Sequence, residues 1–247
     1  MVDIMKYKFA FYTNDYFNQI EQMILDSYSW EYPIFGLSRF EFSTFLHPYF
    51  IDMHNVWNRT CGLWFDGKKL VGCAINEAND EGDAFFLFDC QSRSEDKELI
   101  EEMIFFAKTT MSTVSDDGIT RSVTLHIPQW NGTLKNIAEK SGFINNNWDD
   151  KLLILPFGNK DFQVKLPDGY VFVTGDEVPA FYAANVHMAA FNYSIKSVKD
   201  GEKAFTDLCN APHYNPKLSL YILDSQKRPV AFANIWHNEK MPYCGFG

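Results

Sequence analysis

The chain has 247 residues, enough for one large domain or two medium-sized ones. Hydrophobic residues make up 46% and aromatic residues 17%, so a packed core is available and intrinsic disorder is excluded. The formal net charge is −10 and basic residues do not cluster, so nucleic acid is not expected as a partner.

The cysteines indicate reduced thiols. Cys61, Cys73, Cys90, Cys209 and Cys244 are far apart, odd in number and form no Cys-x-x-Cys pair. The first residues lack the long apolar run of a signal peptide. No stretch approaches the roughly 18 uncharged apolar residues of a membrane span. We therefore expect a cytoplasmic protein that does not bind membranes.

The first part of the chain alternates predicted strands and helices. Apolar residues recur at helical or strand spacing, and Asp66-Gly67 between two apolar runs is a strong hairpin signal. In chain order, the predicted elements are a strand at 7–12, helices at 16–28 and 39–55, hairpin strands at 61–65 and 69–76, a strand at 84–90, a helix at 95–111 and strands at 123–127 and 151–155.

After a predicted linker at 156–160 the pattern restarts. The predicted elements are a strand at 170–173, helices at 178–191 and 198–210, and a hairpin whose stretch "LSLYILDSQKRPVAFANIW" resembles "CGLWFDGKKLVGCAIN". We interpret this as an internal repeat with domains at 1–157 and 161–247, although two unrelated α/β segments also share such an order. The second copy stops after its hairpin, which leaves a sheet edge that the first domain or a homodimer partner would cover.

Three stretches resemble the GNAT superfamily of acetyl-CoA-dependent N-acetyltransferases. They are the hairpin at 63–76, the passage "AFFLFDCQSRSEDKELIEEMI" at 84–104, and "VTLHIPQWNGTLKNIAEKSGF" at 123–143. The last resembles the family pattern N-x-x-A-x-x-L-Y-x-K-x-G-F, and the matching residues are Asn131, Ile137, Lys140, Gly142 and Phe143. The resemblance covers about residues 1–157, with an incomplete second copy.

The resemblance implies an α/β (α+β) fold: a mixed, mostly antiparallel central sheet flanked by helices, with a partial second copy. It also implies acetyl-CoA as co-substrate and a small-molecule or peptide amine as acceptor. The amine attacks the thioester directly, and no metal is required. In such a fold the pantetheine arm bonds along a free strand edge, and the pyrophosphate meets the following loop and helix N-terminus.

By this resemblance we expect the cofactor on the fourth strand, on the loop after it and at the start of the helix after the fifth strand. The expected cofactor-binding residues are Phe88, Asp89, Cys90, Gln91, Arg93, Ser94, Lys97 and Asn131. The candidate bases that would take the proton from the amine are Glu77, Asp89 and His126, with Asp83 also bordering the expected acceptor cleft.

The sequence departs from the family pattern at three positions. Ser94 and Asp96 replace the glycine-type residues of the pyrophosphate loop, and Ala138 stands where the family has a proton-donating tyrosine. An alternative is therefore a catalytically inactive GNAT-like protein that only binds a partner. In that case Ser92 and Glu95 are expected to form a capping box for the next helix.

Two further possibilities come from single residue types. Cys90 is a possible nucleophile, but no base can be placed beside it, and a buried thiol is the favoured interpretation. His47 and His54 are spaced to share one helix face, but no third metal ligand is visible.

Overall fold

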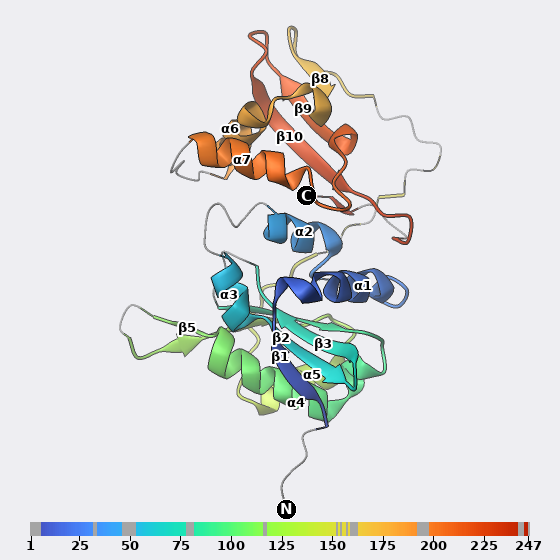
Figure 1. Ribbon diagram of the computed structural model, residues 1–247, viewed down its shortest axis with the longest axis vertical. Helices are drawn as coiled ribbons and strands as arrows, with labels where there is room; N and C mark the ends of the chain where they lie inside the picture. The colour runs from blue at the N-terminus through green and yellow to red at the C-terminus, as the bar shows by residue number, and fades with distance from the viewer. Residues whose placement is uncertain are drawn as a thin grey trace, which may run out of the picture.

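The computed structural model describes residues 6–31, 34–45, 53–77, 82–115, 118–151, 153, 155–156, 158, 163–191, 198–241 and 245–246, with the backbone alone at 53–56, 198–200 and 245–246. His47 and the side chain of His54 lie outside this description. The structure is mixed α and β, as predicted: the described residues form two larger sheets, each with helices packed on it, and one two-stranded ribbon (Figure 1).

The first sheet has the strand order β1-β2-β3-β4-β7. Its strands are β1 (Lys8–Phe11), β2 (Gly62–Asp66), β3 (Lys69–Ile75), β4 (Asp83–Phe88) and β7 (Thr124–His126). The first four are antiparallel neighbours, whereas β4 and β7 are parallel. Two short strands, β5 (Thr113–Val114) and β6 (Arg121–Ser122), form a separate ribbon.

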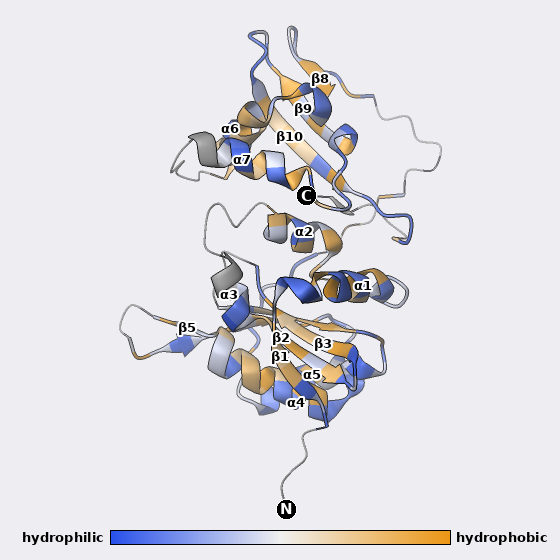
Figure 2. Cartoon of the chain, in the orientation of Figure 1, coloured by the Kyte–Doolittle hydropathy of each residue, from blue (hydrophilic) through white to orange (hydrophobic). Residues whose placement is uncertain are grey.

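Among its described residues, the first half has the α-helices α1 (Phe17–Ser27), α2 (Leu37–Phe45), α3 (Met53–Thr60), α4 (Lys97–Phe106, continued by a π turn at Ala107–Met111) and α5 (Gly132–Lys140). Alternate strand residues point to opposite faces. Leu63, Cys73 and Phe85 pack in one core cluster with α1 and α2. Trp64, Ala74 and Phe86 pack in another with α4 and α5, so this sheet is covered on both faces (Figure 2).

The second sheet has the order β11-β10-β9-β8, with all neighbours antiparallel. Its elements are β8 (Val171–Thr174), α6 (Ala180–Ala190), α7 (Val198–Leu208), β9 (Ser219–Leu223), β10 (Pro229–Trp236) and β11 (Gly245–Phe246). Tyr221 and Trp236 form a core with α6 and α7, and Phe42 and Phe45 of α2 pack against it. Helix α2 therefore lies between the two sheets (Figure 1).

The other face of the second sheet is apolar and belongs to no core cluster of the described residues. Phe172 pairs across the sheet with Ile222, and Ile222 pairs with Ala231. The neighbouring Leu220 is also on this face. Phe172 is 48% exposed and Leu220 38% exposed. In the part of the chain that the structure describes, the second sheet is thus covered on one face only.

One sequence prediction of secondary structure is wrong, and another falls partly outside the described residues. Of the helix expected at 39–55, the structure describes α2 up to Phe45 and α3 from Met53, and residues 46–52 lie outside the description. The strand expected at 151–155 is absent at the described residues 151, 153 and 155, where Leu153 is 86% exposed and pairs with no strand.

No helix among the described residues has the length and apolar character needed to cross a membrane. The four described cysteines, Cys61, Cys73, Cys90 and Cys209, are free thiols. Cys61 and Cys73 are buried side by side, with their Sγ atoms 3.8 Å apart, and burial raises the pKa of Cys61. These two are therefore core residues rather than nucleophiles.

Candidate functional site

The parallel strands β4 and β7 separate soon after they begin. They pair at Asp83–Thr124, Ala84–Leu125 and Phe85–His126, and β7 ends there while β4 continues to Phe88. On the other edge of β4, the Asp89 N–H donates to the Val71 carbonyl over 3.3 Å. Because hydrogen bonding alternates along an antiparallel pair, the N–H and C=O of Phe88 point away from β3, toward the side where β7 has ended.

Asn131, which follows β7, and Ser94, which follows β4, meet beyond the end of the pairing between the two strands. The Asn131 amide donates to the Ser94 carbonyl over 3.1 Å, and its Oδ1 accepts from the Leu134 N–H over 2.9 Å, which caps α5. Asn131 is buried, and so is Ser94. The fold therefore brings together two of the residues expected to bind the cofactor, but both polar ends of Asn131 already have partners within the chain.

Asp96 caps the N-terminus of α4. The predicted capping box of Ser92 and Glu95 is therefore wrong. Asp96 accepts from the Leu99 N–H, from Lys6 Nζ at 2.7 Å and from the Tyr7 hydroxyl at 2.6 Å. Partial burial opposes ionisation, but the hydrogen bonds outweigh it and lower the pKa of Asp96 to about 2. A carboxylate thus occupies the helix end that would otherwise attract an anion.

Two cationic side chains near this loop, Arg93 and Lys69, already pair with groups of the chain itself. Arg93 donates to the Tyr7 hydroxyl over 2.7 Å and to Asp66 over 2.6 Å. Lys69 pairs with Asp89 over 2.6 Å. Among the other predicted cofactor residues, Gln91 and Lys97 are exposed, Phe88 is buried, and Cys90 is half-buried beside Asp89 and Ser92.

A second polar cluster surrounds Phe85 at the start of β4. The His126 Nε2 lies 3.2 Å from Asp83 Oδ1, and its ring stacks on Phe85 with centroids 4.1 Å apart and planes 8° from parallel. The Arg39 guanidinium also lies over the Phe85 ring, at 5.1 Å, and pairs with Glu77 over 2.5 Å. The fold brings the predicted residues His126, Glu77 and Asp83 together around one aromatic ring.

This cluster can do proton chemistry. A histidine next to a carboxylate is held in one orientation and can act as a general base. Asp89 lies four residues beyond Phe85 along β4, about 13 Å away at the usual rise of a strand, so Asp89 and His126 cannot act on the same atom. Sequence reasoning missed Arg39, whose partner Glu77 comes from a distant segment.

A third polar cluster, also missed from the sequence, joins the two halves. Glu41 of α2 is fully buried and accepts from the Trp236 indole N–H over 3.2 Å and from the backbone N–H of His213 over 3.0 Å. The His213 Nδ1 also contacts Glu41, and its Nε2 contacts the Asn238 amide. No local pattern could reveal this cluster, since Glu41 and His213 are 172 residues apart.

The hydrogen bonds of this cluster indicate the tautomer of His213, that is, which ring nitrogen carries the proton. Asn238 Oδ1 accepts from the Lys240 N–H, so its NH₂ group donates to His213 Nε2, and Nδ1 then carries the proton and donates to Glu41. Glu21 lies beside them, 3.6 Å from His213, and burial raises its pKa. Glu21, Glu41 and His213 offer ligand atoms within 4.8 Å of one another, but the bonded ring nitrogens favour a structural contact between the halves.

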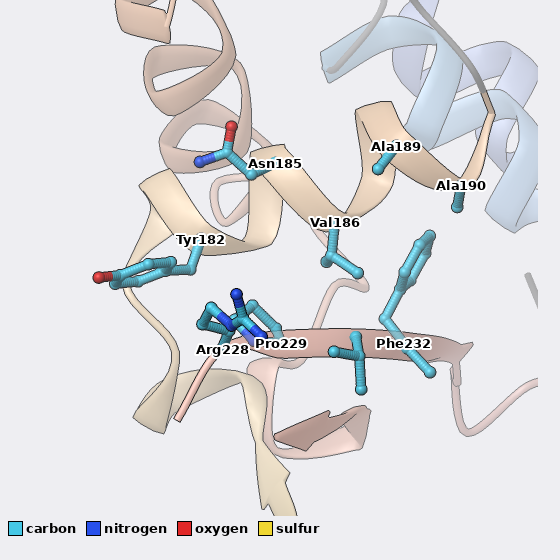
Figure 3. A pocket seen from close by; sticks show the side chains of 10 residues that line it. Tyr182, Asn185, Val186, Ala189, Ala190, Arg228, Pro229 and Phe232 are labelled. Carbon is cyan, nitrogen blue, oxygen red and sulfur yellow. The ribbon is translucent and has the colours of Figure 1, made fainter. Parts of the chain in front are cut away.

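A cavity lies elsewhere, between α6 and β10 of the second half. It has a volume of about 740 Å³, and its lining includes Val186 and Ala189 of α6 and Phe232 of β10. Figure 3 shows Val186 and Phe232 directed toward each other across the space, with Arg228 and Tyr182 at one end. None of the predicted site residues lines it.

No protein-family model matches the chain, and no curated protein does either. The geometry of the described residues therefore carries the functional argument.

Proposed function

We propose that the chain is a GNAT-like protein that binds acetyl-CoA and transfers its acetyl group to the amine of a small molecule or peptide. The observation that supports this most is the pairing of β4 with β7, which ends at Phe85 and His126. Beyond that point the backbone N–H and C=O of Phe88 face the side on which β7 no longer pairs with β4. An amide-rich pantetheine arm can bond there as an added strand does.

The proposed reaction needs few groups. The amine nitrogen attacks the thioester carbon, the carbon–nitrogen bond forms, and the carbon–sulfur bond breaks to release CoA as a thiolate. His126, oriented by Asp83 at 3.2 Å, takes the proton from the amine. Ala138 is buried and carries no proton to give, so the thiolate receives its proton from His126 or from water.

The second candidate is a GNAT-like protein that binds but does not catalyse. The observation that favours it is the Asp96 carboxylate at the N-terminus of α4, together with Arg93 engaged by Asp66. Both features weaken the attraction of this end for a pyrophosphate.

Calorimetry with acetyl-CoA, followed by an assay for free CoA thiol with a panel of amines, separates these candidates. Micromolar binding with thiol release supports the transferase, and binding without release supports the non-catalytic protein. No binding at millimolar acetyl-CoA contradicts the transferase and supports the non-catalytic protein, whose partner need not be acetyl-CoA. In the active case His126→Ala is expected to lower kcat about 100-fold with acetyl-CoA affinity unchanged, whereas His237→Ala, remote in sequence and in the other half, is expected to leave kcat unchanged.

A further inference from the structure

The cavity of the second half occupies the position that a strand fills in the first half. Both halves run strand, helix, helix, hairpin: β1, α1, α2, β2 and β3 in the first, and β8, α6, α7, β9 and β10 in the second, with the additional α3 in the first. The stretch 71–74 (VGCA) of β3 corresponds to 230–233 (VAFA) of β10. Cys73 and Phe232 both belong to the core under the helices of their half.

In the first half the outer edge of β3 carries β4. Gly72, Cys73 and Ala74 pair with Phe88, Leu87 and Phe86. Helix α1 contacts both strands, and the alternate residues Phe85 and Leu87 of β4 pack in the core on that side. The space between α1 and the edge of β3 is therefore filled by an apolar strand.

In the second half the same edge is open over most of its length. Helix α6 contacts β10, as α1 contacts β3. Among the described residues, β11 pairs with β10 only at Ile235 and Trp236, and no strand lies along 229–234. The 740 Å³ cavity lies at this place, lined by α6 and by residues 228–232 of β10 (Figure 3).

We propose that this groove binds an extended apolar segment of another protein, which adds to β10 as an antiparallel β-strand beneath α6. Main-chain hydrogen bonds to the edge of β10 would hold the segment, and its alternate apolar side chains would contact Val186, Ala189 and Phe232. The segment would extend the edge that β11 already begins. Pro229 lacks an N–H and limits the pairing at the other end.

The charges indicate which segment fits. The one cation of the lining, Arg228, is bonded to Asp224 through Nε at 2.9 Å and Nη2 at 2.7 Å, so the groove offers little net charge to a partner. An uncharged apolar segment is therefore favoured over an acidic or basic one. A second copy of this chain is disfavoured, because each copy has a net charge of −10 and the two would repel.

The probe for this proposal is a fluorescent peptide with the β4 sequence 83–89 (DAFFLFD), extended by lysines for solubility. The full-length chain is expected to raise its anisotropy in a saturable way, with Kd below about 100 μM. Two N-methylated peptides, modified at alternate amides, test the mode of binding. Because a strand bonds through one edge only, one peptide should bind at least tenfold more weakly and the other nearly normally.

Two tryptophan variants test whether the peptide binds in the groove between α6 and β10. Ala189→Trp fills the groove from an exposed position and is expected to weaken peptide binding at least tenfold, while Thr206→Trp, at an exposed position of α7, is expected to have no effect. Circular dichroism verifies that both variants fold. The proposal is overturned by an unsaturable peptide signal, by equal binding to Ala189→Trp and the unchanged chain, by equal effects of the two N-methylated peptides, or by a stable dimer that excludes the peptide.

Discussion

The two halves of this chain begin alike and finish differently. Each opens with a strand, a pair of packing helices and a hairpin, and among the described residues the first continues into β4, α4, β7 and α5. The first sheet is consequently buried between two layers of helices. The second has helices on one face, an apolar face that no described helix covers, and a groove beside β10. A shared opening pattern determines how a sheet starts, whereas the later elements determine whether it is closed.

The second half also depends on the first for part of its core. Phe42 and Phe45 of α2 pack against α6, α7 and β10, and Glu41 beside them binds His213 and Trp236. Contacts of this kind are expected to make the two halves unfold together. The substitutions below test how the two halves differ in stability and in the cover of their sheets.

Among the contacts that join the halves, the largest effect is expected for Glu41→Ala. The change removes a fully buried carboxylate and leaves the N–H groups of His213 and Trp236 without their acceptor. Breaking a buried polar network in this way costs about 3 kcal/mol of unfolding free energy. Urea unfolding measures it, with the exposed Glu98→Ala as control. A loss below about 1 kcal/mol would show that the halves are held by apolar packing alone.

A smaller effect is expected for Asp96→Ala in the first half. Loss of this N-cap, with its bonds to Lys6 and Tyr7, should lower the unfolding free energy by about 1–2 kcal/mol near pH 7.

The same residue predicts a pH dependence. The pKa of Asp96 is lowered to about 2 in the folded chain, so the carboxylate stabilises the fold above the pKa of about 3.9 that an unfolded aspartate has. This contribution is lost as the pH falls from about 4 to 2. The difference between the unchanged chain and Asp96→Ala should therefore shrink across that range, and a constant difference would contradict the assignment.

Asp96→Asn separates the charge from the cap, because asparagine caps helices about as well as aspartate. If the proposed acetyl-CoA site is correct, removing this negative charge from the end of α4 should tighten acetyl-CoA binding severalfold, about 1 kcal/mol by calorimetry. Glu101→Gln, exposed and one turn further along α4, is the matched control. Unchanged affinity in both variants would place the cofactor away from this loop.

The smallest effect is expected on the uncovered face of the second sheet. Phe172→Lys adds a charge where the side chain is already 48% exposed, so the unfolding free energy should change by about 0.5 kcal/mol or less. Phe86→Lys, on the covered face of the first sheet, should cost more than about 3 kcal/mol. Similar losses in both variants would mean that something covers the second sheet after all.

Local signals in the sequence predicted the fold well where a few neighbouring residues decide it. The Asp66-Gly67 turn, with Gly67 at φ +61°, gave the first hairpin its position, and the helical spacing of Ile20, Met23 and Ile24 gave α1. The helix after Asn131 is also local: Asn131 caps it, and Gly142, at φ +94°, ends it. Asn131 and Gly142 therefore account for the motif at 131–143 as start and stop signals of a helix, without reference to a cofactor.

What the sequence could not predict depends on residues far apart in the chain. The pairing of His126 with Asp83 needs the parallel register of β4 and β7, and the pairing of Arg39 with Glu77 needs α2 beside the end of β3. Asp96, and not Ser92, caps α4, because the Lys6 ammonium and the Tyr7 hydroxyl, from the start of the chain, bind the Asp96 carboxylate. No pattern within a short window contains such information.

The contact between Glu41 and Trp236 has a consequence for the order of folding during synthesis. Trp236 follows Glu41 by 195 residues, and ribosomes add about 5–20 residues per second. During synthesis, Glu41 therefore waits about 10–40 s for its indole partner, with its carboxylate in water and Phe42 and Phe45 without the core they later join. The first sheet can assemble in this interval, so the second half emerges next to a folded surface and completes it.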